Sequence, residues 1–162
     1  MNKLLKYIKM GELIERKGIR FYKNALKRVV DGNSKSLLGF LIKEEENHLE
    51  FFISLERKYR GKNKEKVLVK SKPPVFRKSD YKRIKGKRAE TFNIFNTALQ
   101  IEIESINLYS SLAKKVRDKK LKNFLIKLAN IEKSHFKLIK SHQQTLYDYL
   151  YWQVRTQERI EM

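Results

Sequence analysis

The chain has 162 residues, of which 35% are charged and 41% hydrophobic, with 38 Lys+Arg against 18 Asp+Glu and no Cys. The lack of cysteine excludes disulfides, thiolate zinc sites, cysteine-held iron–sulfur centres and thiol nucleophiles, so any metal must be bound by His and carboxylates. The longest apolar run, residues 37–42, is too short for a membrane span, and no secretory signal follows the basic N-terminus. We therefore expect a soluble, cytoplasmic protein.

Four long helices are predicted, because the sequence on both sides of residues 57–88 is poor in Gly and Pro and rich in Leu, Ile, Lys and Glu. Capping residues at Asp31 to Ser34 and at Asp118 break each side into two helices. The expected fold is all-α, a single domain over residues 1–162. Its expected parts are a first hairpin at 3–58 (helices at about 3–30 and 34–58), a basic crossover at 59–87, and a second hairpin at 88–157 (helices at about 88–117 and 119–157).

The connection between the hairpins carries most of the charge. Residues 57–88 hold fifteen Lys/Arg against two acidic residues, which is thirteen of the twenty net positive charges. One interpretation is binding of nucleic acid or another polyanion, with Tyr59, Phe76 and Tyr81 stacking on bases. We favour a solvated crossover in a Lys-rich protein, because no nucleic-acid-binding motif accompanies the charge.

The two halves of the chain are repeats of one another. A shift of 87 residues, without any gap, places identical residues of the two halves on each other. The pairs include Glu15 with Glu102, Tyr22 with Tyr109, Asp31 with Asp118, Glu45 with Glu132 and His48 with His135.

Each helix has one apolar stripe with the three- and four-residue spacing of a face turned toward a bundle core. A carboxylate stands in the middle of every stripe, and two stripes add an imidazole one turn later. No Lys or Arg lies beside these groups on the stripes, so ionised carboxylates would be buried without compensation, at a cost of several kcal/mol per charge. The six residues are Glu15, Glu45, His48, Glu102, Glu132 and His135.

A pair of divalent cations would balance the four carboxylates, and carboxylate oxygen with imidazole nitrogen suits iron, manganese or zinc. Glu and His at i and i+3 lie on one helix face, so each such pair can bind one ion. A single E-x-x-H occurs easily by chance, whereas two copies at the same depth of the two halves favour metal binding over a surface-charge explanation. The predicted pairs are Glu45 with His48 and Glu132 with His135, and Glu15 and Glu102 complete or bridge the two ions.

With these motifs the sequence resembles the ferritin-like di-iron carboxylate proteins, closest to the rubrerythrin and bacterioferritin branch. The matching segments cover both hairpins and are 15–22, Glu45 to His48, 102–109 and Glu132 to His135. The resemblance implies an antiparallel four-helix bundle in which one long crossover joins two hairpins. It also implies a di-iron site with Glu15 and Glu102 as single-carboxylate ligands, and the reduction of hydrogen peroxide or dioxygen in oxidative-stress defence.

The chain departs from that family in two ways. Rubrerythrins in the strict sense carry a rubredoxin-like iron domain held by four cysteines, which this sequence lacks, so electrons would have to come from a separate donor protein. Peroxide-reducing members place an extra Glu three residues after the third-helix ligand, and that position here is Ser105. We therefore expect a symmetric site, more like the bacterioferritin centre.

Tyr22 and Tyr109 lie two helical turns after Glu15 and Glu102. There a phenol can hydrogen-bond a ligating carboxylate across the bundle, or it can simply pack in the core with its hydroxyl satisfied elsewhere. The two interpretations are equally well supported by the sequence.

Other positions have more ordinary explanations. Gly18 and Ser105 either leave room for a small oxidant or permit close helix packing, and His142 is expected to be structural or exposed. Solvated helix faces are expected for Glu44, Glu46, Glu50 and Glu104. The aromatic tail of the last helix indicates self-association into a homodimer or larger homo-oligomer; its residues are Tyr147, Tyr149, Tyr151 and Trp152.

The leading hypothesis is a redox enzyme that binds two iron ions and reduces hydrogen peroxide or dioxygen. Two alternatives stay open: a ferroxidase or iron-storage protein, and a nucleic-acid-associated protein that uses residues 57–88. Manganese and zinc also suit the same donors.

Overall fold

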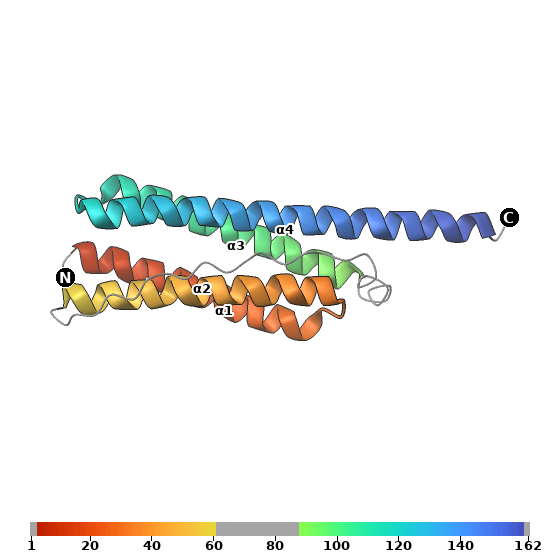
Figure 1. Cartoon of the computed structure of the whole chain (residues 1–162), viewed down its shortest axis with the longest axis horizontal. Helices are drawn as coiled ribbons and strands as arrows, with labels where there is room; N and C mark the ends of the chain where they lie inside the picture. The colour runs from red at the N-terminus through yellow and green to blue at the C-terminus, as the bar shows by residue number, and fades with distance from the viewer. Residues whose placement is uncertain (1–2, 61–87, 161–162) are drawn as a thin grey trace.

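The computed structural model describes residues 3–60 and 88–160, and there the protein is an antiparallel bundle of four helices. The first hairpin consists of α1 (Lys3–Arg28) and α2 (Gly32–Tyr59), and the second of α3 (Arg88–Lys115) and α4 (Lys119–Ile160). The most extensive packing is between the two helices of each hairpin (Figure 1). The all-α bundle expected from the sequence is confirmed.

The two middle helices run in the same direction although they follow each other in the chain (Figure 1). α2 ends at one end of the bundle and α3 begins at the other. Since a helix of 28 residues is about 42 Å long, the end of α2 and the start of α3 are separated by roughly the length of the bundle. Residues 61–87, which make up most of the predicted basic crossover, lie outside the described residues.

Both interhelical turns use the same capping interaction. Asp31 precedes α2 with extended backbone angles (φ −81°, ψ 147°), and its side chain accepts a hydrogen bond from the backbone N–H of Ser34 at 2.7 Å. In the second hairpin Asp118 accepts one from the N–H of Leu121 at 2.8 Å. Each cap contributes about 1 kcal/mol. Because Asp31 is the capping residue, α2 begins at Gly32 rather than at residue 34. The helices α1 and α3 end at Arg28 and Lys115, two residues before the expected 30 and 117.

The bundle core consists of two apolar clusters with a polar layer between them. One cluster contains Tyr22, Leu38 and Leu41, and the other contains Tyr109 and Leu125. Burying each such side chain stabilises the fold by roughly 2 kcal/mol. The polar layer consists of the six predicted ligand residues, all of which are buried.

Glycine is required at Gly11, where a Cβ atom would overlap the buried ring of Phe52 on α2. At Gly18 the situation differs, since a Cβ atom there would meet its nearest neighbour, Ile101, at an ordinary 3.8 Å. Close helix packing therefore accounts for Gly11 but does not demand a glycine at position 18.

Candidate metal centre

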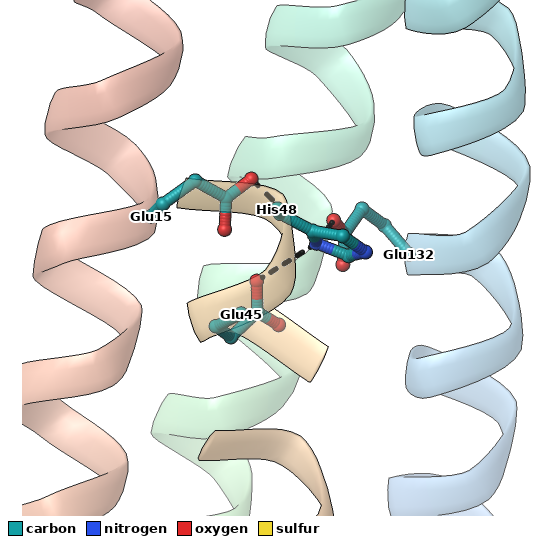
Figure 2. A group of neighbouring side chains, drawn as sticks. All are labelled: Glu15, Glu45, His48 and Glu132. Atoms are coloured by element: carbon teal, nitrogen blue, oxygen red, sulfur yellow. Dashed lines mark hydrogen bonds and ion pairs between the residues drawn. The ribbon is translucent and has the colours of Figure 1, made fainter. Parts of the chain in front are cut away.

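All six predicted ligand residues meet in the middle of the bundle. Figure 2 shows four of them, with Glu15 from α1, Glu45 and His48 from α2, and Glu132 from α4 turned toward one another. Glu102 from α3 and His135 from α4 complete the cluster. Two overlapping groups each offer four ligand atoms that lie within 4.8 Å of one another: Glu15, Glu45, His48 and Glu132, and Glu45, Glu102, Glu132 and His135.

The first group surrounds the Nδ1 atom of His48. This atom lies 3.2 Å from Glu45 Oε2 and 3.1 Å from Glu132 Oε1. Glu15 Oε1 is slightly farther away, at 3.7 Å. The E-x-x-H spacing on α2 explains the first of these contacts, because residues three apart share a helix face.

The second group repeats the first around His135. Its Nδ1 atom lies 3.0 Å from Glu132 Oε2, 3.4 Å from Glu45 Oε1 and 3.7 Å from Glu102 Oε2. Glu45 and Glu132 therefore each contact both imidazoles, one oxygen to each. The 87-residue sequence repeat therefore produces two equivalent candidate metal positions, which share the carboxylates of Glu45 and Glu132.

Each buried tyrosine reaches across to the opposite hairpin. The hydroxyl of Tyr22 donates a hydrogen bond to Glu102, and that of Tyr109 donates one to Glu15. Burial, with the nearby carboxylates, raises the pKa of both phenols well above the ordinary value, so both remain proton donors. Of the two interpretations for these tyrosines, the hydrogen-bonded one describes the structure.

The outer carboxylates of the cluster are shifted toward their neutral form. Burial, reinforced by the charge of Glu45, raises the pKa of Glu15 well above its ordinary value. Burial likewise raises the pKa of Glu102 despite the opposing contact with His135, and the charges of Glu132 and Glu45 act in the same direction as burial. Both groups hold a proton more tightly than an exposed glutamate does.

The shared carboxylates and the imidazoles are shifted toward their charged forms. Burial opposes ionisation of Glu45, but hydrogen bonds to Glu15, His135 and His48 outweigh it and lower the pKa. The pKa of Glu132 is lowered because the two imidazoles outweigh burial and the charge of Glu45. The pKa of each imidazole is raised well above its usual value, since the surrounding carboxylates overcome the effect of burial. In the cluster without metal these shifts favour the neutral form of Glu15 and Glu102 and the charged form of the imidazoles and of Glu45 and Glu132.

The residues present fit a pair of divalent cations. Glu102 Oε2 is buried and receives no hydrogen bond from the described residues, with His135 Nδ1 3.7 Å away. An oxygen left in that state costs about 1–3 kcal/mol, which a bound cation would remove. The protons held by the cluster can be exchanged for the four charges of two divalent ions without leaving a net buried charge.

Glu44 is the residue of this site that sequence reasoning missed. It was expected on a solvated face, but it is only 8% exposed and its Oε2 lies 3.9 Å from His135 Nε2, the ring nitrogen turned away from the carboxylate cluster. The available signal is its place beside Glu45: a residue next to the centre of a core-facing stripe lies at the edge of that stripe, not on the opposite face. The expectation for Glu44 is wrong for this reason.

His142 has a structural role in the described molecule. Its side chain is fully buried, and its Nε2 atom lies 2.9 Å from the hydroxyl of Ser34. Burial lowers the pKa of His142 to about 4, so this imidazole is neutral. The contact joins α4 to the start of α2, in the apolar half of the core that contains Tyr22.

The aromatic residues late in α4 lie outside the cluster. Tyr147, Tyr151 and Trp152 are exposed, and Tyr149 is half-buried. Within the described ranges no helix combines the length and apolarity that crossing a membrane requires. Most of the basic stretch considered for nucleic-acid binding falls in residues 61–87 and so outside the described residues.

Comparison with known proteins agrees with this geometry. The rubrerythrin family model matches residues 6–143, which include both hairpins and all six residues of the cluster. No curated protein was found to match the chain. No solved structure was found to match it either. On the extent of the family match, the chain belongs to the rubrerythrin family.

Proposed function

We propose that this protein is a rubrerythrin-like non-haem di-iron protein that binds two iron ions between its four helices and reduces hydrogen peroxide or dioxygen. One observation carries the proposal: His48 and His135 face equivalent sets of three buried carboxylates at 3.0–3.7 Å. Oxygen-rich sites with one imidazole per ion and two shared carboxylates suit a pair of redox-active divalent metals.

The side chains of this cluster have separable roles in the proposed site. Glu45 and Glu132 lie within 3.4 Å of both imidazoles, so they are the bridging candidates. Glu15 lies beside His48 and Glu102 lies beside His135, so each is a candidate ligand of a single ion. Tyr22 and Tyr109 hold the outer carboxylates in place by hydrogen bonds.

When bound, iron would supply the electron-transfer chemistry, and no side chain has to act as a nucleophile. The protein separates the two positions, supplies four carboxylates as counter-charge and excludes bulk water through complete burial of the ligands. With no cysteine in the sequence, electrons would come from a separate donor protein.

One observation favours a second function, ferroxidation with or without iron storage. Ser105, three residues after Glu102, is buried where a peroxide-reducing relative would carry a further carboxylate. The resulting positions are nearly equivalent, a symmetry that supports oxidation of bound Fe(II) by dioxygen as an alternative to efficient peroxide turnover.

Anaerobic Fe(II) titration of protein purified without a metal-affinity tag tests the proposal. We expect saturation near two ions per chain, and loss of at least one of them in Glu132→Ala and in Glu45→Ala. Glu46→Ala is the matched control, because Glu46 is exposed and pairs with Lys23 at the surface. Unchanged stoichiometry in both cluster variants would contradict the ligand assignment.

The reduced, iron-loaded protein then distinguishes the two functions. Rapid oxidation by hydrogen peroxide with slow oxidation by air supports a peroxidase, and the reverse supports a ferroxidase. Continued uptake far beyond two ions per chain supports storage. If neither hydrogen peroxide nor dioxygen changes the oxidation state of the bound iron, both proposed functions are contradicted.

A further inference from the structure

The last helix is longer than the internal repeat explains. With the shift of 87 residues, the end of α2 at Tyr59 corresponds to Leu146, so residues 147–160 of α4 have no counterpart in the first hairpin. These fourteen residues, here called the α4 extension, add about 21 Å of helix. Figure 1 shows α4 projecting past the other three helices at this end.

One face of the α4 extension packs on the bundle and the other is aromatic and exposed. Leu150 is buried in a small cluster with Val30 and Phe92. On the outer side the exposed fractions are 55% for Tyr147, 50% for Tyr151 and 65% for Trp152. An exposed aromatic patch of this kind is typical of an interaction surface. Its rings are arranged against one another, since those of Tyr147 and Tyr151 stack with centroids 6.3 Å apart.

The charges of the α4 extension are balanced, unlike those of the chain as a whole. Its acidic residues are Asp148 and Glu158 and its basic residues are Arg155 and Arg159, whereas the whole chain has a formal net charge of +20. A net positive charge makes two copies of this chain repel each other. The α4 extension adds nothing to that repulsion, because its own charges cancel.

The order of the charges is self-complementary for an antiparallel pair. Asp148 and Arg155 are seven residues apart, which places them on one helix face, with Tyr151 and Trp152 midway between them. A twofold axis midway between Tyr151 and Trp152 puts Asp148 of one copy opposite Arg155 of the other, twice. The guanidinium of Arg155 lies over the Tyr151 ring at 5.2 Å, so it is already held at the edge of the aromatic patch.

We propose that the α4 extension is a homodimerisation surface, on which it pairs antiparallel with the same segment of a second copy of this chain. The three aromatic side chains of both copies offer roughly 600 Å² for burial, if each contributes roughly half of the area that a fully buried ring covers. This is about half of the roughly 1,200 Å² at which specific interfaces begin, so the flanking residues contribute as well. We therefore expect a weak, reversible dimer.

Analytical ultracentrifugation of the full chain over a wide concentration range tests the proposal, with fluorescence as a local readout. Trp152 is the sole tryptophan of the sequence, so its emission reports directly on this surface. We expect a monomer–dimer equilibrium and a blue shift of the emission that follows it. Trp152→Ser should weaken the dimer at least tenfold, while metal binding at the distant cluster, and thermal unfolding measured at concentrations where both proteins are monomeric, stay unchanged.

A charge-reversal pair tests the antiparallel register. D148R and R155D alone each place like charges opposite one another and should weaken the dimer about tenfold or more. The double variant D148R/R155D restores opposite charges across the interface and should recover most of the affinity. A parallel pair would not be rescued in this way, because each position would face itself.

Three results would overturn the proposal. The first is a monomer at all concentrations up to about 1 mM, where even a dimer with a standard binding free energy of only about −4 kcal/mol would be populated. The second is a dimer that neither responds to Trp152→Ser nor recovers in the double charge variant. The third is a protein that stays monomeric while vesicles containing anionic phospholipid shift the Trp152 emission to the blue, which would assign the surface to a membrane instead.

Discussion

The two hairpins agree closely at the centre of the bundle and diverge away from it. Around the two imidazoles the matched distances differ by at most 0.3 Å, the largest difference being 3.1 Å for His48 to Glu132 against 3.4 Å for His135 to Glu45. Each hairpin also sends one tyrosine hydroxyl to a carboxylate of the other. At the centre of the bundle, the short distances between side chains and the need to balance buried charge restrict the residue types of both hairpins in the same way.

Away from the centre, equivalent positions satisfy the same need with different chemistry. The ion pair of Lys9 with Glu56 at 2.7 Å corresponds by the repeat to a neutral hydrogen bond at 2.8 Å between the amides of Gln143 and Asn96. The polar contact of Ser34 with His142 corresponds to two apolar residues, Leu121 and Leu55. Packing at these positions requires satisfied partners but no particular residue type.

The largest expected effect concerns protons, and it applies equally to both halves. The raised pKa values favour one imidazolium and one carboxylic acid per hairpin in the metal-free cluster, and both groups lose their protons when a metal binds. Binding of two Zn²⁺ or Co²⁺ ions should therefore release about four protons, and the affinity for each ion should fall up to about 100-fold per unit decrease in pH. Indicator titration in weak buffer measures the release; binding without proton release would contradict the assignment of the protonated groups.

The tyrosines provide a direct test of equivalence. Tyr22→Phe and Tyr109→Phe each remove one hydrogen bond to an outer carboxylate, and each should weaken metal binding by about 10–100-fold. Competition with a chromophoric chelator measures both, with Tyr147→Phe as a control on an exposed tyrosine. Effects that differ by more than about tenfold between the two variants would show that the halves are not equivalent in function.

At low pH the two hairpins should differ in their contribution to folding stability, and the difference should arise at His142. In the unfolded chain this imidazole has its ordinary pKa, whereas burial lowers the pKa to about 4 in the folded state, so the unfolded state takes up more protons as the pH falls between these values. Folding stability is therefore lost as the solution becomes acidic. His142→Leu, which introduces the residue found at the equivalent position 55, should lose about 2 kcal/mol less than the native chain between about pH 7 and pH 5. Urea unfolding at both pH values measures this; equal losses would contradict a buried, neutral imidazole.

The smallest expected effect distinguishes the two metal positions. Glu44 lies 3.9 Å from His135 Nε2, but its counterpart in the second half is Ile131, so His48 has no equivalent carboxylate at that position. Glu44→Gln should weaken one of the two Co²⁺-binding steps about tenfold and leave the other unchanged. Glu46→Gln serves as the exposed control. Equal weakening of both steps would show that Glu44 does not act through His135.

Much of the fold was predictable because it depends on local and periodic signals. The apolar stripes, the capping aspartates and the gap-free repeat predict four helices in two hairpins without reference to any long-range contact. The convergence of Glu15, Glu45, Glu102 and Glu132 was predictable for a similar reason, since the middle of each core-facing stripe lies at the same depth. Their binding of metal stays a prediction until metal content is measured.

The amino-acid pattern is sufficient to assign most core positions, because the helical period places each residue on a face; Glu44, at the edge of a stripe, is an exception. Tertiary structure alone decided how those residues divide their tasks: that Glu45 and Glu132 each contact both imidazoles, that Glu44 is buried beside His135, and that His142 pairs with Ser34. These features depend on distances between helices and on side-chain rotamers. The helical period places a residue on a face, but only the packing of all four helices decides which atom of which neighbour it meets.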